Sequence, residues 1–238
     1  MGGRIAEHAL ACALGLALLA GVPGCQSGQR YEQAITVLID VSGTYADQKD
    51  EAVQIIKREI LPTMIPGDSL AVIRIDSESY ARENLEVLLT LDRRPSHANA
   101  QKLALAQKLD RFAARSERSE HTDIPGAMML ASEYLKELGS GSRVILVFSD
   151  MQEELPPGAT RTLTEQELEE THVVAMNVKR LQRDSADPER YRARLAAWEQ
   201  RVDEAGAAGW RTIVDARHLP EHLEQIRAGG VQGEQQTL

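Results

Sequence analysis

The stretch Ala34–Thr44 reads AITVLIDVSGT, and it decides the fold that we expect. Its first part, Ala34–Asp40, is a nearly continuous run of aliphatic and β-branched residues that ends in one acidic residue. Such a run is typical of a strand buried on both faces, as in a parallel sheet covered by helices on each side. In open sheets of this kind, ligands bind at the carboxyl ends of the strands. The polar residues that follow the run are therefore the first candidates for a functional site.

Strand-like and helix-like segments alternate along the rest of the chain. The further apolar runs that we interpret as strands are Ser69–Ile75, Glu86–Leu91, Arg143–Phe148, His172–Val178 and Trp210–Val214. The segments with helical character are Asp47–Glu59, Ala98–Ala114, Ile124–Leu138, Pro188–Ala205 and Leu219–Ile226. This alternation predicts a Rossmann-like α/β fold, in which one open, mostly parallel sheet has helices on both faces. The short run Glu86–Leu91 is expected at an edge of that sheet.

The first polar cluster combines one carboxylate with two hydroxyls. Asp40, Ser42 and Thr44 stand at alternate positions, so their side chains can point at a common centre. Gly43 between them allows the backbone to fold tightly around that centre. We therefore expect these three oxygen donors to act together.

Two later segments bring further oxygen donors to the same region. Asp150 follows the strand at Arg143–Phe148, so we expect its carboxylate at the same edge of the sheet. Thr122 lies just before the helix Ile124–Leu138, and its hydroxyl can reach the same point. The neighbouring Asp123 is interpreted as a charge that suits the N-terminus of that helix.

Carboxylate and hydroxyl oxygens are hard donors, which suit Mg²⁺, Mn²⁺ or Ca²⁺ rather than zinc. With few carboxylates in the set, a bound Mg²⁺ would keep waters and an open position, which a carboxylate of a partner can fill. A plainer interpretation stays open. Ser42 and Thr44 can cap the following helix, and Asp40 and Asp150 can be turn residues at strand ends.

The set of polar residues resembles the metal-ion-dependent adhesion site (MIDAS) of the von Willebrand factor type A (VWA) domain. That family has Asp-x-Ser-x-Ser after the first strand, a Thr in a mid-domain loop and an Asp after the fourth strand. With Thr in place of the second Ser, the matching residues here are Asp40, Ser42, Thr44, Thr122 and Asp150. Where the family commonly has Gly after the last Asp, this chain has Met151. The resemblance covers roughly residues 34–228, and it implies a VWA fold, a bound Mg²⁺ and a protein-binding function.

An enzymatic interpretation rests on the same stretch. Asp40–Thr44 also resembles the first motif of haloacid-dehalogenase-type phosphatases, Asp-x-Asp-x-Thr, in which the first Asp is the nucleophile and the second is the general acid and base. The second position here is Ser42, which cannot protonate a leaving group, and no acidic residue adjoins Asp150. We therefore expect that the protein is not an enzyme, and the phosphatase stays as the less favoured alternative.

The N-terminal residues carry the pattern of an export signal. Ala9–Val22 is an apolar run that is too short to span a bilayer, which takes about 20 residues, but has the length of a signal-peptide core. The run ends in Val-Pro-Gly-Cys, and the segment resembles a bacterial lipoprotein signal. This resemblance implies cleavage before Cys25 and acylation of Cys25, with palmitate among the acyl groups. An ordinary secretory signal and a first buried helix are the alternatives.

These interpretations divide the chain into four parts. They are a signal peptide at 1–24, a tether at 25–33, one VWA-like domain at 34–228 and a flexible tail at 229–238. The two cysteines, Cys12 and Cys25, both precede the domain, so the domain has no disulfide, no thiol nucleophile and no cysteine-ligated zinc. The 27 basic and 36 acidic residues leave a net charge of −9, which argues against nucleic acid as a partner.

The sequence thus predicts an exported, membrane-anchored binding module that recognises a protein partner through a divalent cation. The expected location is a bacterial cell envelope. In a Gram-negative cell, Gln26 favours the outer membrane facing the periplasm, because an Asp at that position often marks retention in the inner membrane. A VWA-fold scaffold with a silent metal site is the main alternative.

Overall fold

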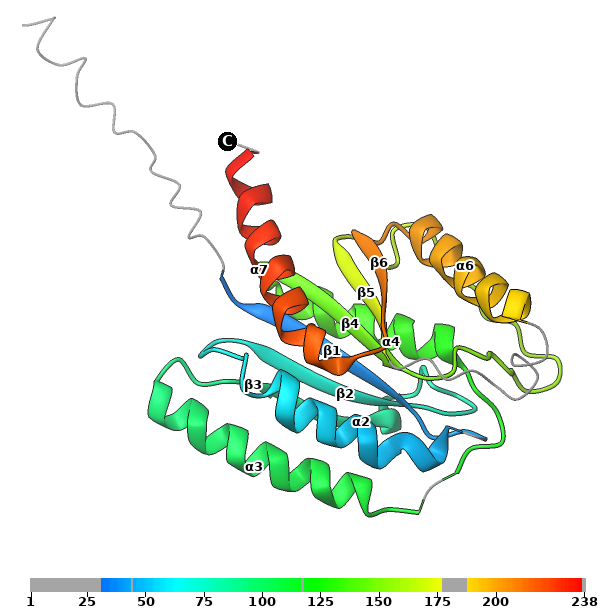
Figure 1. Ribbon diagram of the computed structural model, residues 1–238, viewed down its shortest axis with the longest axis horizontal. Helices are drawn as coiled ribbons and strands as arrows, with labels where there is room; N and C mark the ends of the chain where they lie inside the picture. The colour runs from blue at the N-terminus through cyan, green and yellow to red at the C-terminus, as the bar shows by residue number, and fades with distance from the viewer. Residues whose placement is uncertain (1–30, 44, 117, 177–187, 237–238) are drawn as a thin grey trace, which may run out of the picture.

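A computed structural model of the protein describes residues 31–43, 45–116, 118–176 and 188–236. Within these residues, six strands form one sheet in the order β3-β2-β1-β4-β5-β6 (Figure 1). The strands are β1 (Gln33–Asp40), β2 (Ser69–Ile75), β3 (Leu85–Thr90), β4 (Ser142–Phe148), β5 (Thr171–Met176) and β6 (Gly209–Ile213). All neighbouring pairs are parallel except β2 and β3, which are antiparallel. The expected fold class is confirmed, and β3 is an edge strand as expected.

Helices cover both faces of the sheet (Figure 1). The main helices are α2 (Lys49–Ile55), α3 (Pro95–Ala113), α4 (Ile124–Leu138), α6 (Pro188–Glu204) and α7 (Leu219–Gln236). A π-helical segment, η2 (Ile56–Ile60), continues α2, and three single helical turns are η1 (Ala46–Gln48), η3 (Arg82–Asn84) and η4 (Ala216–His218). Helices α2, α3 and α7 pack on one face, and α4 and α6 pack on the other.

The apolar run of β1 is explained by its central position. All eight residues of β1 are buried, because it lies between β2 and β4 and under helices on both sides. Ile35, Val37 and Ile39 point into the cluster with α2, α3 and α7, whereas Ala34 and Leu38 point into the cluster with α4 and α6. Because both faces of this strand are buried, its sequence does not alternate between apolar and polar residues as that of a surface strand does.

Two elements differ from the expected helices. The segment expected as one helix over 47–59 begins with a 3₁₀ turn and ends in η2, where the Leu61 N–H donates to the Ile56 carbonyl at 2.9 Å. Helix α7 continues to Gln236, so the boundary that we expected at residue 228 falls inside a helix. The residues beyond 228 are mostly Gln, Glu, Val and Gly, and none of them is a proline that would end the helix.

Helix α7 is fastened to the amino ends of β1 and β2 by a buried ion pair. The Arg227 guanidinium donates from Nη1 and Nη2 to the two carboxylate oxygens of Asp68, each at 2.9 Å. The same carboxylate accepts the backbone N–H groups of Gln33 and Ile65, both at 2.8 Å. Asp68 is fully buried, so these donors replace the water that it has lost.

Among the helices of the described ranges, we find none with the length and apolar character needed to cross a membrane. The expected signal peptide and most of the tether, including Cys25, lie outside the described residues.

Candidate metal centre

The candidate residues converge because β1 and β4 are parallel neighbours in the sheet. Ile39 of β1 pairs with Phe148 of β4. Asp40 and Asp150 therefore both lie at the carboxyl-end edge of the sheet. After β1 the chain continues to β2 and β3 on one side of β1, and it later returns to form β4 on the other side. This is the kind of switch point at which open α/β sheets bind ligands.

Asp40 is the centre of a hydrogen-bonded cluster. It is 1% exposed, and its Oδ1 accepts the backbone N–H of Ser42 at 2.8 Å and the Ser42 hydroxyl at 2.5 Å. Its Oδ2 accepts the Ser149 hydroxyl at 2.7 Å. Burial raises the pKa of Asp40 to about 6, even though these hydrogen bonds lower it, and the charge of Asp150 adds to the rise. The cluster therefore holds a carboxylate at a substantial cost in desolvation.

Thr122 joins the cluster through its hydroxyl. The Thr122 Oγ1 and Ser42 Oγ atoms lie 2.5 Å apart, within hydrogen-bond distance. Two backbone hydrogen bonds hold Thr122 to Glu154, one from the Thr122 N–H at 2.7 Å and one from the Glu154 N–H at 3.1 Å. The segment that ends at Thr122 also pairs with the β1 end, since the Ser119 N–H donates to the Val41 carbonyl at 3.1 Å.

Asp150 lies at the rim of the cluster. It is 6% exposed, and its Oδ1 accepts the backbone N–H of Gln152 at 2.8 Å. The charge of Asp150 raises the pKa of Asp40. The structure therefore bonds Asp40, Ser42 and Thr122 to one another and places Asp150 within electrostatic reach of them.

Asp123 lies at the N-terminus of α4, where the sequence predicts a favourable charge, and it also caps the helix. Its Oδ1 accepts the Gly126 N–H at 2.8 Å at the start of α4, and its Oδ2 lies 2.9 Å from the Arg161 Nε. Asp123 is fully buried, and burial raises its pKa, although the Gly126 hydrogen bond and the Arg161 charge oppose the rise. The cap fixes the start of α4 and, with it, the position of Thr122.

Comparison with solved structures gives matches of low sequence identity. An aerotolerance-related membrane protein from Bacteroides fragilis is 14% identical, with 83% of this chain and 99% of that chain covered and a TM-score of 0.48. A von Willebrand factor type A protein from Catenulispora acidiphila is 14% identical, with coverage of 84% and 43% and a TM-score of 0.46. Proximal thread matrix protein 1 from the mussel byssus, with a zinc-occupied MIDAS motif, is 11% identical, with coverage of 85% and 46% and a TM-score of 0.47.

The chain thus shows similarity to proteins that include a von Willebrand factor type A protein, and its own six-stranded, mostly parallel sheet is the α/β arrangement that the sequence predicts. No protein-family model and no curated protein matches the sequence. The candidate site therefore rests on the residues of this chain alone.

The oxygen donors of the cluster are of the chemical type that a small hard cation prefers. Mg²⁺ holds oxygens at 2.0–2.1 Å in an octahedron, which places adjacent ligand oxygens about 2.9 Å apart. The Ser42 hydroxyl lies 2.5 Å from both the Asp40 Oδ1 and the Thr122 Oγ1, so small outward shifts would give that spacing. Within the described residues, no group of three or more His, Cys, Asp or Glu side chains is placed to hold a metal ion. A site at this cluster would therefore depend on its hydroxyls.

Two of the residues at the cluster need separate comment. Thr44 lies outside the described residues, so its place in the set stays a prediction. Met151, which stands where the VWA family commonly has Gly, has a φ of 60°, the left-handed conformation that glycine adopts most readily. Its side chain is 1% exposed, and its carbonyl accepts the Trp198 indole N–H at 2.8 Å. Packing against α6 thus supports a glycine-like backbone after Asp150.

Sequence reasoning missed two members of the cluster. Ser149 bonds to Asp40, and its only signal was a hydroxyl directly before Asp150 at a strand end. Tyr45 is 2% exposed, and burial, with the charges of Asp40 and Glu51, raises the pKa of its phenol. Tyr45 had no signal beyond its position after the Asp40–Thr44 motif.

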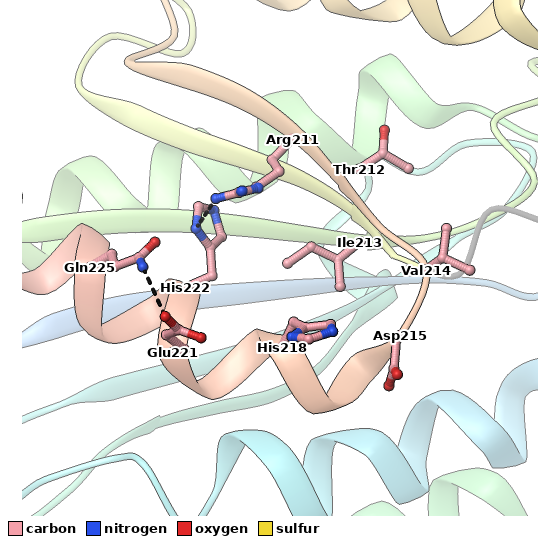
Figure 2. A pocket seen from close by; sticks show the side chains of 9 residues that line it. All are labelled: Arg211, Thr212, Ile213, Val214, Asp215, His218, Glu221, His222 and Gln225. Atoms are coloured by element: carbon pink, nitrogen blue, oxygen red, sulfur yellow. Dashed lines mark hydrogen bonds between the residues drawn. The ribbon is translucent and has the colours of Figure 1, made fainter.

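A hollow of about 410 Å³ lies between β6 and α7, and none of the cluster residues lines it (Figure 2). Arg211 of β6 points at His222 of α7, with the Arg211 Nη1 and His222 Nδ1 atoms 3.1 Å apart. Glu221 accepts a hydrogen bond from Gln225 at 3.3 Å. The mixed charges of this hollow favour no ligand class.

Proposed function

We propose that this VWA-like domain is a binding module that recognises a protein partner through a divalent cation held by Asp40, Ser42, Thr44, Thr122 and Asp150. The observation that carries the proposal is the Ser42 hydroxyl, which lies 2.5 Å from oxygen atoms of both Asp40 and Thr122. Two segments that are 80 residues apart in the sequence thus present hard oxygens to one point at the edge of the sheet. A bound Mg²⁺ or Mn²⁺ would supply a positive charge there that accepts a carboxylate of the partner.

The residues of this chain have separate tasks in such a site. Ser42 and Thr122 offer neutral oxygens, and Asp40 must lose its proton before it can balance a cation. Asp150 supplies a second negative charge at the rim. Asp40 and Asp150 together balance the two charges of the cation, so a coordination position left open, rather than a net positive charge, would accept the acidic group of a partner.

We also propose that the domain is carried on the cell envelope by a lipid on Cys25. The support is the sequence pattern, an apolar run of signal-peptide length followed by Val-Pro-Gly-Cys. In this proposal the protein is not an enzyme. The Asp40 carboxylate is 1% exposed and accepts three hydrogen bonds, which is a poor setting for a nucleophile.

A scaffold with a silent metal site is the second candidate. It is favoured by one observation, namely that Ser42 and Ser149 already satisfy both oxygens of Asp40 by hydrogen bonds. In that case the cluster is structural, and partners bind elsewhere on the domain.

The deciding experiment is isothermal titration calorimetry of Mg²⁺ and Mn²⁺ into the full chain in a non-ionic detergent. We expect saturable binding that is lost in Asp40→Ala and retained in Asp203→Asn, which removes an exposed carboxylate from the far end of α6. Equal heats for the wild type and Asp40→Ala would reject the cation site and leave the scaffold. Partner capture from an envelope fraction, compared with and without chelator, then tests whether recognition needs the cation.

A further inference from the structure

Strand β6 is an edge strand, and within the described ranges it pairs only with β5. The hollow between β6 and α7 is lined on the β6 side by consecutive residues, Arg211–Asp215, which end the strand and begin the turn after it (Figure 2). Successive side chains of a strand point to opposite faces of the sheet. A hollow that touches each residue in turn therefore lies along the edge of the strand, where its backbone is open, rather than over one face.

The backbone of β6 has hydrogen-bonding groups on its open edge. In a strand, the N–H and C=O groups of alternate residues point to opposite neighbours, so β6 directs one set at β5 and the other set away from the sheet. In the described part of the chain, no backbone N–H of Gly209–Ile213 donates to a loop or a side chain. An extended polypeptide presents donors and acceptors at the matching spacing, so it is the ligand that such an edge binds.

The charged side chain of β6 does not cover this edge. Edge strands are often protected by a charged residue that stands beside the open backbone. The Arg211 guanidinium instead donates from Nη1 to the Nδ1 of His222 on α7 at 3.1 Å, so it is turned onto the helix (Figure 2). Val214, directly after β6, is 70% exposed and adds apolar surface to the edge. The edge is thus open and partly apolar.

Arg211 indicates which side chain the added segment carries beside it. Arg211 and Ile213 point toward α7 (Figure 2). Thr212 and Val214 point to the other side of the strand. Burial and the charge of Arg211 lower the pKa of His222, so its ring is neutral at neutral pH and leaves the Arg211 charge unbalanced. Within the described residues, Arg211 forms no ion pair with a carboxylate, so an acidic residue opposite it can supply the missing charge.

A second copy of this chain is a poorer occupant of the edge than another protein. The sequence of β6, Gly-Trp-Arg-Thr-Ile, has no acidic residue that could face Arg211. Each copy also carries a net charge of −9, which opposes the association of two copies. The charges therefore favour a different protein that supplies the acidic residue.

We infer that β6 receives an extended segment of a partner protein, which adds to the sheet as an antiparallel strand and places an acidic residue opposite Arg211. Backbone hydrogen bonds provide the affinity, and the side chains beside Arg211, Ile213 and Val214 provide the preference. The inference goes beyond the proposed function, because this docking edge needs no divalent cation and its hollow is lined by no residue of the oxygen cluster.

The test uses the full chain in a non-ionic detergent with EDTA, and its readout is the fluorescence anisotropy of a labelled peptide, Thr-Val-Thr-Glu-Thr-Ser-Ser. In the antiparallel direction this peptide places Glu opposite Arg211 and Val opposite Ile213. Two further peptides have the same side chains but carry N-methyl groups on one or the other set of alternate residues. An added strand uses one edge of its backbone, so one of them should bind about tenfold or more weakly than the parent and the other within about threefold of it.

A charge exchange shows where the peptide binds. Arg211→Glu should weaken binding of the parent peptide about three- to tenfold, and it should strengthen binding of a peptide with Lys in place of Glu by a similar factor. Arg192→Glu is the matched control, because it replaces an arginine of α6 whose side chain is 71% exposed and does not line the hollow. This control should change neither affinity by more than about twofold.

Each outcome decides one part of the inference. No binding of the parent peptide, or binding that neither N-methylated peptide loses, would overturn strand addition. Equal responses of Arg211→Glu and Arg192→Glu would overturn the assignment to β6. A wild-type dimer in sedimentation equilibrium that the peptide dissociates would overturn the inference in favour of a second copy. Because all measurements are made in EDTA, they stand apart from the calorimetry that tests the cation site.

Discussion

Replacing Asp40 by Asn is expected to stabilise the protein when no divalent cation is present. Burial raises the pKa of this carboxyl from 3.8 to about 6. Each unit of pKa difference corresponds to about 1.36 kcal/mol, so the ionised carboxylate costs the folded state about 3 kcal/mol at pH 8. Asn keeps the shape, and its Oδ1 still accepts from the Ser42 N–H and hydroxyl, while the Ser149 hydroxyl can turn to accept from the amide NH₂ that replaces Oδ2.

The pH dependence of this gain follows from the direction of the shift. The folded-state pKa of Asp40 lies above the unfolded-state value, so its carboxyl costs nothing when the pH is below both. The cost grows as the pH rises through 6, from about 1.6 kcal/mol at pH 5 to about 3 kcal/mol at pH 8. The advantage of Asp40→Asn should therefore be about 1.4 kcal/mol larger at pH 8 than at pH 5.

Mg²⁺ should remove most of this difference in stability. A ligand at 100 times its dissociation constant stabilises the folded state by about 2.7 kcal/mol, which nearly cancels the cost of the Asp40 charge. The wild type should therefore approach or pass Asp40→Asn in stability when Mg²⁺ is saturating, and Asp40→Asn should not respond to Mg²⁺.

The assay is urea denaturation of the full chain, followed by circular dichroism at pH 5 and pH 8, in EDTA and in Mg²⁺. Asp203→Asn is the control for the loss of one exposed carboxylate. If Asp40→Asn is less stable than the wild type at pH 8 in EDTA, then the hydrogen bonds of Asp40 outweigh its desolvation and the reasoning is refuted. A gain that does not change with pH would refute the assignment of the effect to ionisation.

Three further predictions concern the same edge of the sheet and the N-terminus. The affinity for Mg²⁺ should fall about tenfold for each pH unit below 6, because Asp40 must lose a proton to bind a cation. Calorimetry at pH 5, 6 and 7 measures this affinity. An affinity that does not change with pH would exclude Asp40 as a ligand. Gly126→Ala should cost about 2 kcal/mol in urea denaturation, because the added Cβ would lie 2.2 Å from the Asp123 carboxylate that caps α4, whereas Gly229→Ala, with open space around it, should be neutral or slightly stabilising. Cys25→Ser should lose the acyl mass seen by mass spectrometry of the membrane-bound protein and move it to the soluble fraction; an unchanged mass and location would exclude the lipid anchor.

The sheet and the convergence of the candidate residues were predictable because they depend on short-range patterns. The apolar run of β1 indicates burial on both faces, and parallel strands buried in this way end at a common edge. Asp40 and Asp150 therefore had to be placed near each other once β1 and β4 were neighbours. The place of Asp123 at a helix N-terminus followed from its position directly before an apolar helical segment, whereas its capping hydrogen bond is seen only in the structure.

The rest depends on tertiary geometry that no local pattern contains. Whether Ser149 points at Asp40, for example, depends on how the chain turns after β4. The effect of Met151 was also hidden, because its left-handed backbone is supported by Trp198, which is 47 residues away in the chain. The π-helical segment η2 (Ile56–Ile60) similarly reflects packing rather than the helix propensity of its residues.

The buried pair of Arg227 and Asp68 makes the first strand depend on the last helix. Arg227 also donates to the Tyr31 carbonyl at 3.0 Å, so it touches a residue 196 positions earlier, just ahead of β1. A chain that ended before Arg227 would leave the Asp68 carboxylate buried without its cation, at a cost of about 3–5 kcal/mol. That is a large part of the stability of a typical domain, so a truncated product should be recognisably unstable. The stable fold therefore requires that the C-terminal helix has been synthesised and has docked against the sheet.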